Sequence, residues 1–280
     1  MSRATSRAPG GLRARSGAPA GTALITGASS GIGEALARRF AAGGHDLVLV
    51  ARSADALKAL AASLADEHGV KAWAVRADLS EPDAVPRLAA AMKRAKRPID
   101  VLVNNAGVLE YGPFAGMTPE THRRMIELNV GALTQMLAHF VPPMLERGHG
   151  RVLNVASIAA FQPIPALATY AATKAFVLSM TESLAEELRG SGVTATALCP
   201  GVTATDMLSG AARSHEGLGR LPSAFVGTAA SVAAEGYEAC LRGETIRVPG
   251  RLNLAATLAS RAAPKWLVRR LGGAMSRSIA

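Results

Sequence analysis

The feature of this sequence that most constrains its fold is an alternation of short apolar runs with longer segments of helical period, which begins at residue 22. Such alternation is typical of a parallel sheet built from βαβ units. The runs, such as residues 47–50, are apolar without interruption, as expected for strands that helices cover on both faces. We therefore predict an α/β fold with a doubly wound (Rossmann) seven-stranded parallel sheet in a single domain.

The predicted strands comprise residues 22–26, 46–50, 71–76, 99–104, 151–156, 193–199 and 244–248. The predicted helices comprise residues 32–42, 54–67, 83–95, 120–146 and 167–189. Pro142 and Pro143 should kink or end the fourth helix, because proline removes a backbone donor and clashes with the preceding turn. Residues 202–227 break the alternation with four glycines and follow the sixth strand, so they are predicted to form a lid over the ligand end of the sheet.

The formal net charge of +10 suggests a nucleic-acid partner at first, but its distribution argues against one. Residues 1–20 and 245–280 together carry 11 basic side chains and no acid, which leaves a net charge of −1 on residues 21–244. Aromatic residues that could stack on bases are few. We predict a basic, disordered tail over residues 1–20, with a transit-like peptide as the lesser alternative, a catalytic domain over 21–250 and no nucleic-acid partner.

The two cysteines, Cys199 and Cys240, lie far apart, and neither belongs to a CxxC or histidine-containing cluster. The six histidines show no metal-ligand spacing, so no metal is predicted. No GxSxG element suggests a hydrolase. The absence of a long apolar run argues against a membrane-spanning helix, and unpaired cysteines are typical of a reducing compartment, so a cytoplasmic location is expected.

A glycine-rich turn over residues 26–33 follows the first strand and opens the first helix, which is the context of a dinucleotide site. Its three glycines, Gly27, Gly31 and Gly33, fit a TGxxxGxG pattern. In this pattern the chain resembles the short-chain dehydrogenases/reductases, in their one-domain, tyrosine-dependent branch, over about residues 20–250. The resemblance implies that a nicotinamide cofactor contacts three sets of residues: Gly27, Ser29, Ser30, Gly31, Ile32 and Gly33; Asp78, Leu79, Asn105, Ala106 and Gly107; and Pro200, Gly201, Val202 and Thr205. It also implies that the NNAG element, from Asn104 to Gly107, supports the sheet and lines the adenosine side of the cofactor.

Arg52 stands at the end of the second strand, where an acid usually selects NAD(H) and a base selects NADP(H). No acid is present there, and a guanidinium can bind a phosphate through two hydrogen bonds. NADP(H) is therefore the preferred cofactor and NAD(H) the second option, although Arg52 could also be an ordinary solvated loop residue. Asp78 could likewise be an acid at a helix N-terminus.

Tyr170 and Lys174 are four residues apart, so a helix would place them on one face. A nearby ammonium would favour the phenolate of a tyrosine and make it useful in acid–base chemistry. In the family, these two residues act with a serine and a helical asparagine, which match Ser157 and Asn129 here. The resemblance implies that Tyr170 is the general acid, Ser157 polarises the carbonyl, Lys174 stabilises the phenolate and binds the cofactor ribose, and Asn129 holds a water.

Apolar side chains dominate the segments predicted to surround the substrate, where Ile158 joins Ser157 and Tyr170 as a predicted contact. The wall was predicted to comprise Val108, Leu109, Tyr111, Ile158, Phe161, Pro163, Ile164, Met207 and Leu208, with Glu110 and Arg213 as polar exceptions. A lipophilic ketone or aldehyde is the expected substrate, interconverted with its alcohol. The alternative is a regulatory or scaffold protein that binds the cofactor with little turnover.

The extension over residues 251–280 mixes leucines with six cationic side chains. A basic amphipathic helix of this kind can lie on anionic lipid. A contact with the sheet edge or another subunit is the preferred alternative, because Pro264 and Gly272-Gly273 interrupt the apolar stripe. Family members are commonly dimers or tetramers, so a homodimer or homotetramer is expected by analogy.

Overall fold

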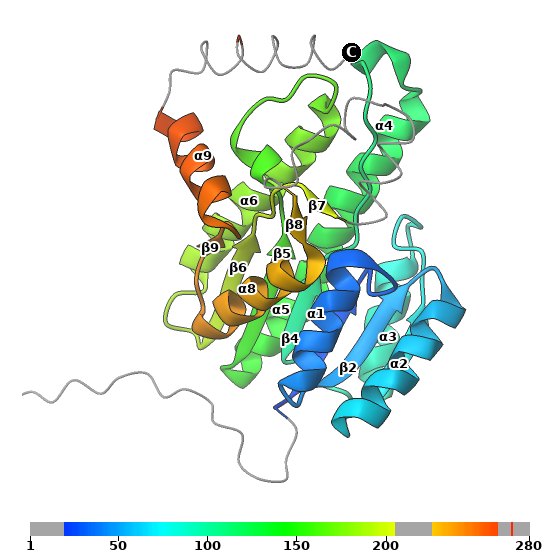
Figure 1. Cartoon of the computed structure of the whole chain (residues 1–280). Helices are drawn as coiled ribbons and strands as arrows, with labels where there is room; N and C mark the ends of the chain where they lie inside the picture. The colour runs from blue at the N-terminus through cyan, green and yellow to red at the C-terminus, as the bar shows by residue number, and fades with distance from the viewer. Residues whose placement is uncertain (1–19, 205–225, 263–269, 271–280) are drawn as a thin grey trace, which may run out of the picture.

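The structure, a computed structural model, describes residues 20–204, 226–262 and 270 of the 280 (Figure 1). Residues 1–19 and 205–225 lie outside the described part, and with them the predicted N-terminal tail, Thr205 and most of the predicted lid. For the last helix, the side chains are described up to residue 260. Within the described residues no helix is long and apolar enough to cross a membrane.

Seven parallel strands form the central sheet in the order β3-β2-β1-β4-β5-β6-β9, which confirms the predicted fold. The strands are β1 (Thr22–Thr26), β2 (Asp46–Ala51), β3 (Ala72–Arg76), β4 (Val101–Asn104), β5 (Gly150–Val155), β6 (Val193–Leu198) and β9 (Ile246–Arg247). A short parallel pair, β7 (Thr203–Ala204) with β8 (Gly227–Thr228), was not predicted. Two-residue strands carry no periodicity, so only the pairing of distant segments reveals them.

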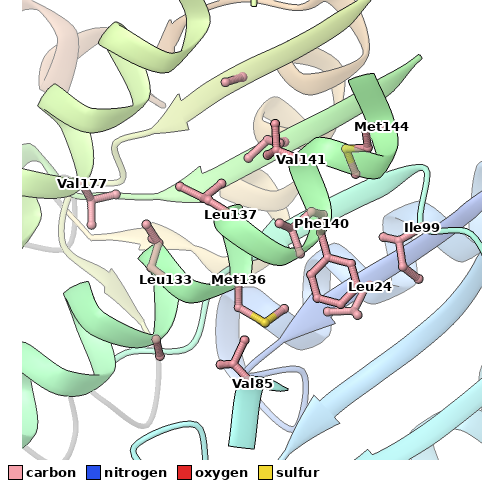
Figure 2. Close-up of a cluster of buried hydrophobic side chains, with 14 of the residues drawn as sticks. Leu24, Val85, Ile99, Leu133, Met136, Leu137, Phe140, Val141, Met144 and Val177 are labelled. Carbon is pink, nitrogen blue, oxygen red and sulfur yellow. The ribbon is translucent and has the colours of Figure 1, made fainter. Parts of the chain in front are cut away.

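Helices cover both faces of this sheet (Figure 1). On one face lie α1 (Gly31–Ala42), α2 (Ala54–His68) and α8 (Ala229–Arg242), and on the other lie α3 (Ala84–Arg94), α5 (Leu133–Arg147) and α6 (Ala168–Glu187). Successive side chains of β1 point to opposite faces of the sheet. Ile25 packs with α1 and α2, whereas Leu24 packs with α3 and α5. Figure 2 shows this second cluster, in which Leu24 lies beside Phe140 and Val85 lies beside Met136.

The predicted helix over residues 120–146 is in fact three consecutive segments. α4 (Pro119–Ile126) leads into η2 (Glu127–Ala132), a π-helical stretch, and then into α5. Pro142 and Pro143 do not end α5, which continues to Arg147 and ends at Gly148 in a left-handed conformation. Val141 and Met144 on either side of the prolines are buried, so packing against the sheet offsets the missing backbone hydrogen bonds.

The strand order reverses between β1 and β4, since the chain first builds outward through β2 and β3 and then crosses to the other side of β1. Connections on opposite sides of a reversal leave a crevice at the carboxyl ends of the strands, where open α/β sheets bind ligands. Two further short helices, η1 (Phe114–Gly116) and η3 (Ile158–Phe161), follow β4 and β5 at this end. The last helix, α9 (Arg251–Ala262), follows β9.

Candidate active site

The glycine turn joins β1 to α1 through backbone conformations that require glycine. Gly27 and Gly31 have φ angles of 65° and 59°, in the left-handed region. Gly33 has a different reason: a Cβ there would lie 2.1 Å from the carbonyl oxygen of Gly27 and 2.4 Å from Nδ2 of Asn105. The turn thus opens the N-terminus of α1, whose first N–H groups lack intrahelical acceptors and suit an anion.

Thr26 and Asn105 lock this turn to the end of β4. The Thr26 hydroxyl accepts hydrogen bonds from the backbone N–H groups of Asn105 (2.9 Å) and Ala106 (3.0 Å). The Asn105 side chain donates in return to the carbonyl oxygens of Thr26 (3.0 Å) and Gly27 (3.2 Å). Asn104 is buried and donates instead to Asn154 Oδ1 at 2.9 Å, which links β4 to β5.

Arg52 follows β2 and Asp78 follows β3. Both line the crevice at the carboxyl ends of the strands. Arg52 is exposed and forms no ion pair within the described part of the chain. Asp78 accepts hydrogen bonds from the Ser80 backbone N–H (3.0 Å) and hydroxyl (2.6 Å), so it is a turn residue and not the start of α3. Burial raises the pKa of Asp78, but these bonds and the charge of Arg52 outweigh it and hold the pKa below its usual value.

Ser157, Tyr170 and Lys174 meet at the ends of β5 and α6. The Tyr170 side chain is buried, and burial raises its pKa to about 12, against a hydrogen bond with Ser157 that lowers it. The Lys174 ammonium lies over the Tyr170 ring, 5.7 Å from its centroid, and donates to the carbonyl oxygen of Val155 at 2.8 Å. Burial lowers the pKa of Lys174 to about 8.

These values differ from the expectation that Lys174 favours the phenolate of Tyr170. In the protein alone, loss of hydration dominates both groups, and it favours the neutral phenol and the neutral amine. The Lys174 proton is directed at the Val155 carbonyl and not at the phenol. At neutral pH Tyr170 is therefore protonated, which is the form that a general acid needs.

Asn129, in η2, is buried, and both the nitrogen and the oxygen of its side-chain amide form hydrogen bonds. Its amide donates to the carbonyl oxygen of Val108 (2.9 Å) and to the Thr173 hydroxyl (3.1 Å), and its oxygen accepts from the Val108 N–H (2.9 Å). These bonds tie the segment after β4 to α6, beside Lys174. Asn129 does not line the crevice itself, and its predicted water stays a prediction.

The crevice encloses a cavity of about 490 Å³ that runs from the glycine turn to Tyr170. Apart from Gly33 and Asn129, every residue in the described chain that was predicted to be catalytic or to bind the cofactor lines it. Of the predicted apolar wall, Val108, Leu109, Tyr111, Ile158 and Ile164 contribute, whereas Phe161, Pro163 and Glu110 do not. Met207, Leu208 and Arg213 lie outside the described residues.

Leu128 and Leu167 also line the cavity and were not predicted. Leu128 precedes Asn129 in the π-helical stretch, and Leu167 precedes the first residue of α6. Neighbouring residues on a helix face different directions, so the sequence offered no signal that Leu128, beside the predicted Asn129, reaches the cavity.

His122 on α4 joins η1 to α6, the helix that carries Tyr170. Its Nδ1 lies 2.8 Å from the Thr169 hydroxyl, and its Nε2 lies 3.2 Å from the carbonyl oxygen of Phe114 in η1. The His122 and Phe114 rings stack with centroids 4.3 Å apart. No sequence pattern singled out His122, because its partners are 8 and 47 residues away.

Comparison with known proteins identifies relatives of this chain. The short chain dehydrogenase family matches residues 21–216. Oxidoreductase UcpA of Escherichia coli is 40% identical over 199 residues, which cover 69% of this chain and 73% of UcpA.

Two solved structures extend the similarity to the fold. A short-chain dehydrogenase from Sphingobium yanoikuyae in complex with NADPH has a TM-score of 0.75 and 36% identity, covering 88% of this chain and 97% of that one. The bulky-bulky ketone specific alcohol dehydrogenase from Comamonas testosteroni has a TM-score of 0.73 and 29% identity, covering 89% and 96%.

Proposed function

Because this chain belongs to the short-chain dehydrogenase/reductase family, whose members are oxidoreductases, we propose that it uses NADP(H) to interconvert a lipophilic ketone or aldehyde and its alcohol. The observation that carries this proposal is the cavity itself. It joins the glycine turn and Arg52 at one end to Ser157, Tyr170 and Lys174 at the other. A cofactor held along it would bring its reactive end to the three polar side chains.

The residues fit a dinucleotide phosphate. The turn at Gly27 and Gly31 leaves the start of α1 open to a pyrophosphate. Gly107 also has little room for a side chain, since a Cβ there would lie 3.0 Å from Oδ1 of Asn129 and 3.7 Å from Nζ of Lys174. Arg52, exposed and lining the cavity, would bind the 2′-phosphate of NADP(H). The NADPH complex of the Sphingobium relative supports this choice of cofactor.

NADPH, when bound, supplies the hydride that reduces a carbonyl carbon. The Ser157 hydroxyl would donate a hydrogen bond to the carbonyl oxygen, which gains negative charge as the bond order falls. Tyr170, protonated at neutral pH, would donate its proton to the same oxygen. Lys174 would stabilise the phenolate that remains and bind the nicotinamide ribose. Asn129 would hold Val108 and Thr173 in place beside Lys174.

The substrate end of the cavity favours an apolar compound. Leu109, Leu128, Ile158, Ile164 and Leu167 line it, and hydrophobic side chains of this kind bind lipophilic groups through burial of apolar surface. The Comamonas relative, described as specific for bulky-bulky ketones, supports the same substrate class.

The test is a substrate panel of aromatic, steroid, acyl and sugar carbonyls, assayed with NADPH and with NADH. We expect turnover to be fastest with NADPH and an apolar ketone or aldehyde. Faster turnover of sugar carbonyls than of apolar ketones or aldehydes would contradict the proposal that the substrate is apolar. NADPH binding without oxidation by any carbonyl would instead favour the cofactor-binding regulatory or scaffold protein. The homodimer or homotetramer stays a prediction, which light scattering of the purified chain would test.

A further inference from the structure

Helix α9 presents its leucines outward and its uncharged polar side chains inward. Thr257 is buried, and Asn253 and Ser260 are half-buried. In contrast, the side chains of Leu252, Leu254 and Leu258 are 60%, 44% and 58% exposed. Ala255 and Ala259 are also exposed, between the leucines on the helix surface. We call these five residues, Leu252, Leu254, Ala255, Leu258 and Ala259, the α9 face.

The polar side of α9 is fixed to the protein near the cavity. Asn253 donates to the Pro249 carbonyl oxygen at 3.0 Å. It also packs so tightly against Gly201, which lines the cavity, that a Cβ at Gly201 would lie 2.5 Å from Nδ2 of Asn253. The helix packs as well against η3, whose Ile158 lines the same cavity. The outward direction of the leucines is therefore set by contacts on the opposite side of the helix.

This orientation bears on what α9 contacts. The sequence favoured an apolar stripe that covers the sheet edge or another subunit over one that lies on lipid. Leu254 lines a small pocket beside Ile246 and Val248 at the sheet edge but stays 44% exposed. Leu252 and Leu258 are 60% and 58% exposed, so within the described residues the three leucines are not buried against the sheet edge. Exposed apolar surface rimmed by polar residues marks an interaction site.

The positive charge of residues 251–280 indicates what binds the α9 face. Residues 251–280 hold six Lys or Arg side chains and no acidic one. Arg251 and Arg270 are exposed, and Arg251 forms no ion pair within the described part of the chain. A symmetric contact between two α9 helices would bring these cations together, which costs free energy. Anionic lipid headgroups offer the opposite charge and an apolar layer directly beneath it.

We propose that the α9 face binds the surface of an anionic lipid bilayer, with the leucines in the acyl boundary and the exposed Arg251 at the headgroups. The helix lies on the membrane and does not span it. Since α9 packs against Gly201 and η3, the bound protein would hold its cavity close to the lipid surface. The proposal does not depend on turnover, although a cavity near lipid suits a lipophilic substrate.

The test is flotation of the full chain with vesicles of phosphatidylcholine, with and without phosphatidylserine. We expect partitioning at least about tenfold stronger with phosphatidylserine, and most of that gain should be lost in 1 M salt, where screening acts within about 3 Å. Leu252→Glu removes an exposed leucine from the α9 face and should lower partitioning at least about tenfold. Leu145→Glu is the matched control, because Leu145 is an exposed leucine on α5.

Equal partitioning to both vesicle types, or an equal loss in the Leu252→Glu and Leu145→Glu variants, would overturn the proposal. So would a Leu252→Glu variant that changes the molecular mass in light scattering while partitioning as before, since this result would identify a second copy of the chain as the occupant. If Leu252→Glu instead lowers thermal stability far more than Leu145→Glu without changing partitioning, the α9 face is covered by another segment of the chain, and the proposal also fails. Circular dichroism of each variant checks that it folds.

Discussion

The ammonium of Lys174 donates a hydrogen bond to the backbone carbonyl oxygen of Val155 at 2.8 Å, which joins α6 to the end of β5 beside Tyr170. This bond orders a buried cation next to a buried phenol, within a cavity that also holds Ser157. Several measurable properties depend on it or on its neighbours.

Lys174 should impose a specific pH dependence on stability. Burial lowers its pKa from 10.5 to about 8, so the unfolded chain binds a proton that the folded chain lacks between these values. Stability should therefore rise with pH across this window, by about 3 kcal/mol relative to Lys174→Met. Chemical unfolding of both proteins from pH 7 to 10.5 measures the difference. Lys58→Met, at an exposed lysine on α2, is the control for removal of a lysine. A Lys174→Met curve that runs parallel to the wild type would contradict the lowered pKa of Lys174.

Tyr170→Phe should reduce turnover by about 10²–10⁴-fold, because it removes the hydroxyl that donates the proton and leaves the ring in place. The Kd for NADPH, measured by fluorescence titration, should change by less than about threefold, an amount that is under 1 kcal/mol. Tyr237→Phe is the control, since Tyr237 is half-buried against Phe40 and does not line the cavity. Comparable losses in both variants would point to a structural effect.

Arg52→Ala should weaken NADPH binding by about 10- to 100-fold, the range expected when charged hydrogen bonds to a phosphate are lost. NADH binding should hardly change, because NADH has no 2′-phosphate for a guanidinium to bind. The two Kd values measure this preference directly. Arg76→Ala provides the comparison, as Arg76 is exposed at the end of β3 and does not line the cavity. An equal effect on both cofactors would exclude the proposed role of Arg52.

Gly33→Ala should destabilise the fold by about 1–3 kcal/mol and weaken cofactor binding, since its Cβ would lie 2.1 Å from the Gly27 carbonyl oxygen and must push the turn aside. Gly131→Ala, in η2, is a control of the same chemistry: nothing lies within 4 Å of the added Cβ. It should be neutral or mildly stabilising. Thermal unfolding of both variants measures the difference in stability. A Gly33→Ala variant as stable as the wild type would show that the turn adjusts without cost and would contradict the prediction.

His122→Phe keeps a ring to stack on Phe114 and loses the hydrogen bonds to Thr169 and the Phe114 carbonyl. We expect KM for an apolar ketone to rise about three- to tenfold, the cost of roughly one hydrogen bond, while NADPH binding is unchanged. His139→Phe on the exposed side of α5 serves as control. If kcat falls with KM unchanged, His122 acts on Tyr170 through Thr169 and not through η1.

The sequence by itself determined the parts of this protein that depend on local physics. The alternation of short apolar runs with helical segments predicted all seven sheet strands to within two residues at each end, because most strands that helices cover on both faces have no polar alternation. The glycine spacing predicted the turn between β1 and α1, because Gly27 and Gly31 occupy conformations that other residues rarely adopt.

Tertiary structure decided everything that depends on contacts between distant segments. The proline pair lies inside α5 because burial of Val141 and Met144 outweighs a local preference. The raised pKa of Tyr170 and the lowered pKa of Lys174 follow from loss of hydration, which depends on what packs around both side chains. Likewise, the leucines of α9 face outward because Asn253 is held against Gly201, 52 positions earlier in the chain. Periodicity locates an apolar stripe, but only packing determines which side of the helix meets the protein.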